Sequence, residues 1–103
     1  MKEIEFRTPR NCDLTKAEQL IESVCKELGL RQVMKGSLAK YPGCSHWHYK
    51  KNEQSGTLEL TLFIPGRRIW AKVQAGRQAP WIDLELPRVR SGIESALRPA
   101  EKR

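Results

Sequence analysis

Residues 57–76 read TLELTLFIPGRRIWAKVQAG, a stretch that predicts two antiparallel strands joined by a tight turn. Apolar residues stand at even positions before Pro65 and at odd positions after Gly66. A short loop centred on these two residues sets Leu62 opposite Ile69, and it thereby brings the apolar side chains of both strands to one face. The other face then carries these cross-strand pairs: Glu59 with Lys72, Thr61 with Trp70, and Phe63 with Arg68.

The segment before this hairpin, residues 45–51, predicts a further strand of the same sheet. A four-residue loop from Asn52 to Ser55 sets Trp47 opposite Leu60, so that this large ring faces the core. A loop one residue longer would instead bury the histidines beside leucines and leave their ring nitrogens unpaired, which is unfavourable. With the shorter loop, the face away from the core carries His46 beside Thr61 and His48 beside Glu59.

The rest of the chain predicts two further strands and two helices. Alternation over residues 3–7 predicts a first strand, and residues 30–38 predict a second. Between them, apolar residues recur at spacings of three and four over residues 14–28, which is typical of a helix with one buried stripe. A second helix is predicted over residues 87–98, because Pro87 suits a first helical position.

Residues 82–86, IDLEL, leave two interpretations open. Their alternation fits a strand, but the same residues also fit a helical turn that Pro87 would break. With either interpretation the sequence predicts an α+β fold. We expect a mainly antiparallel sheet of about five strands with two helices packed on one face, in the order β-α-β-β-β-β-α. Residues 1–98 are predicted to form a single domain, and residues 99–103 a loose C-terminal tail.

Composition narrows the class of protein. A length of 103 residues fits one domain, and the longest apolar run, Leu62–Ile64, is far too short to cross a membrane. No N-terminal stretch has the charged start and apolar run of a signal peptide. Three cysteines cannot all pair within one chain, which favours a reducing compartment. We therefore expect a cytoplasmic protein with no membrane partner.

The positive charge is unevenly distributed along the chain. Residues 31–80 hold nine basic and two acidic side chains, so they account for the whole net charge of +7. Cations interleaved with aromatic rings suit single-stranded nucleic acid, because the cations neutralise phosphates while the rings stack on bases. We therefore predict non-enzymatic binding of an anionic partner, single-stranded nucleic acid or another polyanion, through the basic face of the sheet. The residues predicted to bind it are Lys50, Phe63, Arg68, Trp70, Lys72, Arg77, His46 and His48.

Two alternatives stay open. Cys44, His46 and His48 occur at alternate positions, so a strand projects all three to one side, where their sulfur and nitrogen atoms suit zinc. Glu59 is the acidic residue that the predicted register places beside them. The other alternative is a homodimer or larger homo-oligomer that covers Trp70 and has no role with nucleic acid. The sequence has no glycine-rich nucleotide-binding motif, and apart from the zinc alternative we expect no cofactor and no catalytic residue.

Overall fold

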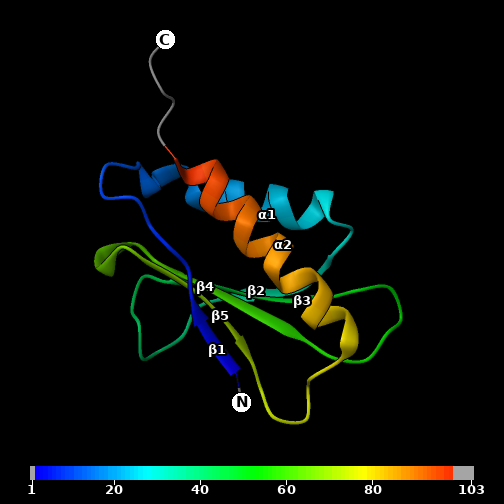
Figure 1. The fold of residues 1–103 in the computed structure, drawn as a ribbon. Coiled ribbons are helices and arrows are strands. Elements are labelled where there is room, and N and C mark those ends of the chain that lie inside the picture. The colour runs from blue at the N-terminus through cyan, green and yellow to red at the C-terminus, as the bar shows by residue number, and fades with distance from the viewer. Residues whose placement is uncertain (1, 99–103) are drawn as a thin grey trace.

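The computed structural model describes residues 2–98, which form a five-stranded antiparallel sheet with two helices on one face (Figure 1). The strands are β1 (Lys2–Glu5), β2 (Arg31–Gly36), β3 (Ser45–Lys50), β4 (Leu58–Phe63) and β5 (Arg68–Val73), and the helices are α1 (Ala17–Glu27) and α2 (Pro80–Leu97). Single 3-10 turns occupy Leu14–Lys16 and Ile64–Gly66. The predicted α+β class and the order of its elements are confirmed. The predicted tail, residues 99–103, lies outside the described residues.

Strands β2 to β5 run as an antiparallel meander, and β1 joins its β5 edge to give the order β1-β5-β4-β3-β2. The predicted register is confirmed in both central strand pairs, for example with Trp47 opposite Leu60 and Leu62 opposite Ile69. After the 3-10 turn between β4 and β5, Arg67 takes a left-handed conformation with φ 52°, and the chain reverses there.

The core lies between the sheet and the two helices. Leu58, Leu60 and Leu62 of β4 are fully buried on this side. They belong to one cluster with apolar side chains of both helices, among them Ile21 of α1 and Ile93 of α2. Burying each such side chain contributes roughly 1.5–3 kcal/mol, so this layer is the main source of the stability of the fold.

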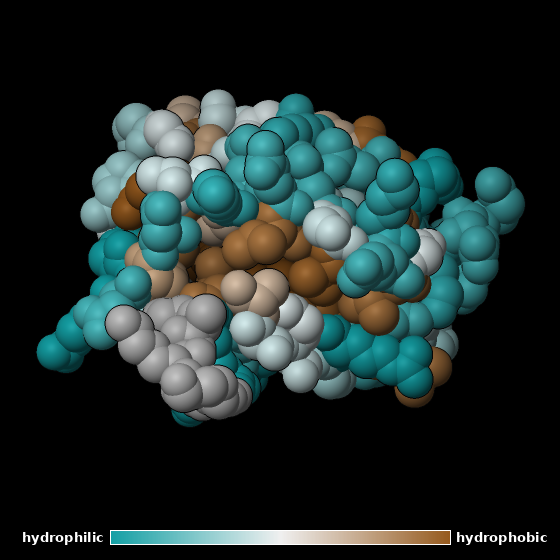
Figure 2. Space-filling view, turned by 90° about the horizontal axis from the view of Figure 1, so that it is seen from above, coloured by the Kyte–Doolittle hydropathy of each residue, from teal (hydrophilic) through white to brown (hydrophobic). Residues whose placement is uncertain are grey.

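The two helices approach closely where α2 carries a glycine. A Cβ atom at Gly92 would lie 2.8 Å from Cγ1 of Val24 in α1, so a larger residue there would push the helices apart. Seen from above, the molecule shows apolar side chains gathered along its middle, with hydrophilic ones around them (Figure 2). A shallow groove between the helices is lined by Val24, Leu28 and Ala96, among others. Neither helix within residues 2–98 has the length and apolar character that crossing a membrane requires.

Helix α2 begins at Pro80, so residues 82–86 are helical and the predicted start at Pro87 is wrong. Proline in a helix interior removes one backbone hydrogen bond and is unfavourable by roughly 3 kcal/mol. Here the first turns of the helix bury Trp81 and Ile82 in the core, and this apolar burial outweighs the penalty. Pro87 therefore lies inside the helix.

Strand β2 forms one edge of the sheet, and all six of its residues are exposed. A bulge between Gln32 and Met34 leaves Val33 without a partner in β3. Val33 and Met34 thus place large apolar side chains in contact with solvent. Lys35 of the same strand forms an ion pair of 2.8 Å with Glu22 of α1, which ties this edge to the helix layer.

The connection from β2 to β3, residues 37–44, folds over the face of the sheet that is turned away from the helices (Figure 1). Its Tyr41 ring packs edge-on against Phe63 and Trp70 of the sheet, with ring centroids 5.3 and 5.0 Å apart. The sheet is thus covered by helices on one face and, in part, by this loop on the other. We refer to the second face as the loop-covered face.

Candidate metal centre

Three side chains with metal-binding atoms converge on the loop-covered face. His46 and His48 alternate along β3 and therefore point the same way, and Glu59 of β4 lies directly opposite His48. The two histidine Nε2 atoms are 3.2 Å apart. Nε2 of His46 lies 3.4 Å from one oxygen of the Glu59 carboxylate, and Nε2 of His48 lies 3.8 Å from the other. Ligand atoms of the three residues all lie within 4.8 Å of one another.

These separations fit a single small metal ion. Two ligands of a tetrahedral zinc ion, each about 2.0–2.1 Å from the metal, lie roughly 3.3 Å from one another. The distances of 3.2 Å between the histidines and 3.4 Å between His46 and Glu59 match this spacing, and the 3.8 Å between His48 and Glu59 is slightly longer. Two imidazoles and one carboxylate are also a ligand set that binds zinc and ferrous iron in proteins.

Neighbouring polar groups hold the cluster in this arrangement. Oγ1 of Thr61 lies 2.8 Å from Nδ1 of His46, which orients the ring and directs its Nε2 toward His48 and Glu59. The Gln74 amide donates a 3.0 Å hydrogen bond to Oε2 of Glu59. Partners of this kind are common around metal ligands, because they set the orientation and the tautomer of each ligand.

Burial shapes the electrostatics of the cluster. The side chains of His46 and Glu59 are 6% and 4% exposed, whereas that of His48 is 23% exposed. Burial lowers the pKa of His46 below its ordinary value, while the charge of Glu59 acts in the opposite direction. The lowered pKa favours the neutral imidazole, which is the form that binds metal ions.

A cavity of about 380 Å³ opens beside the cluster, between the sheet and the 37–44 loop. We call it the sheet pocket. His46 and Glu59 are part of its lining, so the cluster is accessible from this cavity. The other lining residues are Glu3, Leu38, Ala39, Lys40, Tyr41, Thr61, Trp70, Lys72 and Gln74.

Trp70, one of the rings predicted to stack on bases, is covered in the structure. It is only 4% exposed, because the Tyr41 ring lies against it and the Arg68 guanidinium lies 4.4 Å from the centroid of its ring. Phe63 is half-buried and also contacts Tyr41. Stacking of bases on Trp70 would therefore require the 37–44 loop to move away.

The predicted cationic contacts are mostly engaged within the chain. Arg68 forms two hydrogen bonds of 2.9 Å with the Glu5 carboxylate, and Nζ of Lys50 donates to the Gly56 carbonyl at 2.9 Å. The Arg77 guanidinium lies 3.7 Å from Glu59. The remaining member of the predicted set, Lys72, lines the sheet pocket. Binding of single-stranded nucleic acid to this face stays a prediction without further support.

Cys44, the third residue of the predicted zinc set, lies outside the cluster. It precedes β3, is buried, and its sulfur accepts a 3.2 Å hydrogen bond from the backbone N–H of Leu38. This bond joins the two ends of the 37–44 loop. Glu59 takes the place of Cys44 beside the histidines, and the predicted register of β3 and β4 was the signal that pointed to it.

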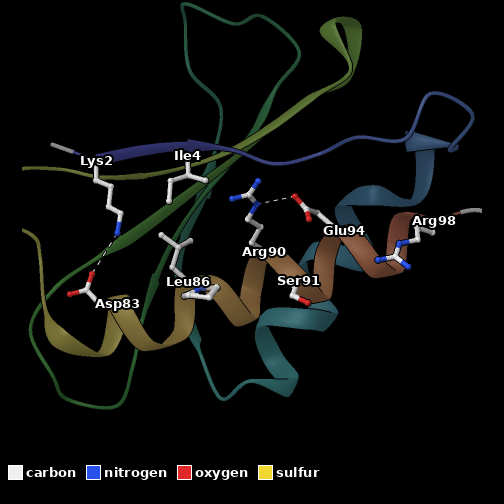
Figure 3. Close-up of a pocket in the computed structure, with 9 residues that line it drawn as sticks. Lys2, Ile4, Asp83, Leu86, Arg90, Ser91, Glu94 and Arg98 are labelled. Atoms are coloured by element: carbon white, nitrogen blue, oxygen red, sulfur yellow. Dashed lines mark hydrogen bonds and ion pairs between the residues drawn. The ribbon is translucent and has the colours of Figure 1, made fainter.

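A second cavity, of about 300 Å³, lies between β1 and α2. Figure 3 shows Ile4 and Leu86 facing each other between two ion pairs, Lys2 with Asp83 at 3.7 Å and Arg90 with Glu94 at 3.0 Å. Because these four charges neutralise one another in pairs, the cavity is typical of a packing contact between a strand and a helix.

Comparisons of the chain with protein-family models, with curated proteins and with solved structures gave no match. The function is therefore inferred from the residues of this chain alone.

Proposed function

We propose that this protein binds one divalent transition metal ion, of the zinc type, through Nε2 of His46, Nε2 of His48 and the carboxylate of Glu59. The observation that carries the proposal is the set of separations between these three groups, from 3.2 to 3.8 Å, on a largely buried part of the sheet. A tetrahedral ion with nitrogen and oxygen ligands requires spacings of about this size.

The surroundings of the cluster are compatible with metal binding. Thr61 pairs with Nδ1 of His46 and leaves Nε2 as the atom that faces the other ligands. Three protein ligands leave at least one coordination position of a zinc ion open. Since both His46 and Glu59 line the sheet pocket, that position is expected to face the cavity.

The test is the metal content and stability of the purified protein. After exposure to zinc and dialysis, elemental analysis is expected to find one zinc ion per chain. Zinc at a hundredfold excess over its Kd should raise the free energy of unfolding by about 2.7 kcal/mol. A protein that holds no zinc and keeps an unchanged melting temperature would refute the proposal.

Variants separate this site from adventitious binding. His46→Ala and Glu59→Gln are each expected to lose stoichiometric zinc, because each removes one of the ligands. Glu53→Gln, which changes an exposed carboxylate in the β3–β4 connection, is the matched control and should keep it. Cys44→Ser should also keep it, since that sulfur is bonded to Leu38 and lies outside the cluster.

A further inference from the structure

The sheet pocket extends beyond the candidate metal ligands. Its volume of about 380 Å³ lies within the range of roughly 300–1,000 Å³ that small-molecule sites occupy in proteins. On the side formed by the 37–44 loop, the lining includes the apolar residues Leu38 and Ala39 and the Tyr41 ring, which packs against Trp70. The pocket therefore combines a polar end at the metal ligands with an apolar and aromatic wall.

Two lysines that line the pocket, Lys40 and Lys72, have no ion-pair partner among the described residues. Among the residues that the structure describes, no carboxylate lies within 4.0 Å of the ammonium nitrogen of Lys40 or of Lys72. Lys72 stands directly opposite Glu59 in the sheet and lines the same pocket as His46, so it lies near the candidate metal centre. Lys40 lies over the ring of Tyr41, with its Nζ 5.8 Å from the ring centroid.

The charge balance of the pocket depends on the metal ion. Without metal, the carboxylates of Glu3 and Glu59 offset the two lysines of the lining, and the Arg77 guanidinium, 3.7 Å from Glu59, adds a positive charge beside it. A bound divalent cation adds its full charge to this site. An anion that completes the metal shell would remove this excess, and a neutral ligand would not.

We infer that the metal-loaded sheet pocket binds a small organic anion whose carboxylate or phosphate group completes the metal shell and pairs with Lys72. This inference rests on the metal site proposed above. The apolar part of the ligand lies against Leu38 and the Tyr41 ring on the loop side of the pocket. Leu38, Ala39, Lys40 and Tyr41 of the 37–44 loop form one wall of the cavity, so the site suits a single small molecule rather than a nucleic acid strand.

Cobalt(II) in place of zinc allows metal binding and anion binding to be followed by absorption spectroscopy, because its absorption bands depend on the ligands around the metal. Phenyl phosphate, benzoate and inorganic phosphate are titrated into the cobalt-loaded protein. We expect phenyl phosphate or benzoate to change the cobalt spectrum at concentrations several-fold lower than inorganic phosphate, since only the first two carry a ring that can contact the aromatic wall.

Lysine variants test the proposed contact directly. Lys72→Met should weaken binding of the aromatic anion by about tenfold or more while cobalt affinity is retained, and Lys72→Arg should restore most of the loss. Lys40→Met, in the loop, should have a smaller effect. It replaces Lys72→Met as the test of the anion contact if Lys72→Met does not fold. Lys26→Met, on the exposed surface of α1, is the control and should change nothing.

The outcomes separate the inference from the metal site itself. If cobalt produces no bound spectrum, the proposed metal function fails. If cobalt binds but no anion alters its spectrum, or if Lys72→Met leaves anion affinity unchanged, the inference fails and the metal site stands. If single-stranded RNA perturbs the cobalt spectrum at lower concentration than the small anions, the pocket serves a polymer and the inference is overturned.

Discussion

The two faces of this sheet are both covered, but by different means and with different results. On one face, Leu58, Leu60 and Leu62 of β4 lie under two helices in an apolar core. On the other face of the same strand, Glu59 and Thr61 are buried as well, at 3% and 1% exposure, although they are polar. The helices contribute apolar surface, whereas the loop-covered face satisfies its polar groups through one another. Burial on the first face stabilises the fold, and burial on the second brings together the residues of the proposed metal site.

The largest expected effect comes from the helix-covered face. Leu60→Ala leaves a cavity between sheet and helices and should lower the free energy of unfolding by about 2–5 kcal/mol in urea denaturation. Zinc stoichiometry of the folded protein should not change, because Leu60 lies in the core, on the face of the sheet away from the proposed ligands. Val33→Ala, on the exposed strand edge, is the control and should stay within about 0.5 kcal/mol of the wild type. A Leu60→Ala protein that folds normally but no longer binds zinc would show that the faces are coupled.

An intermediate effect is expected from removing the ring that holds the loop over the sheet. Tyr41→Ala deletes two aromatic contacts and should lower the free energy of unfolding by about 1–2 kcal/mol. The other tryptophans, Trp47 and Trp81, are buried in the core, so stronger quenching of tryptophan fluorescence by iodide would report the exposure of Trp70. Tyr41→Phe keeps the ring and should behave as the wild type. Unchanged quenching in Tyr41→Ala would mean that other parts of the loop cover Trp70.

The smallest effect is expected at the rim of the loop-covered face, where Arg68 pairs with Glu5. The hydrogen bond and the charge of Arg68 hold the pKa of the Glu5 carboxyl below its ordinary value. A carboxyl with a lowered folded-state pKa stabilises the protein above its unfolded pKa and loses this contribution as pH falls through the folded value. Because both side chains are about half exposed, the contribution is less than about 1 kcal/mol. The difference in stability between wild type and Glu5→Gln should thus be small at neutral pH and vanish in acid. A difference that grew as the pH fell would contradict this assignment.

The sequence predicts the centre of the sheet well and the start of the last helix poorly. The change from even to odd apolar positions around Pro65–Gly66 is compatible with few registers, and it identified the pairing of β4 with β5. Residues 82–86 alternate between apolar and polar, but Leu84 is 69% exposed in the structure, so the pattern did not reflect one buried face. The helical burial of Trp81 and Ile82 decided the conformation of this segment.

The sequence predicted two of the three candidate ligands, His46 and His48, but it included Cys44 in place of Glu59. It did not predict the loop that covers the site. Alternation along β3 and the register with β4 were enough to place His48 beside Glu59. The 37–44 loop has no apolar periodicity that indicates where it packs, so its contact with Trp70 could not be predicted from the sequence. For the same reason, the pocket that the loop forms with the sheet became apparent only in three dimensions.

The bulge in β2 affects how two copies of this chain can meet. An unbroken exposed strand offers a regular series of N–H and C=O groups on which a strand of a second molecule can add, and such growth leads to aggregates. In β2 the irregularity at Val33 interrupts that series in the middle of a six-residue strand. A neighbouring chain could match the backbone groups on one side of the bulge or on the other, but not along the whole edge. The sheet is thereby protected from open-ended extension at this edge despite the apolar side chains displayed there.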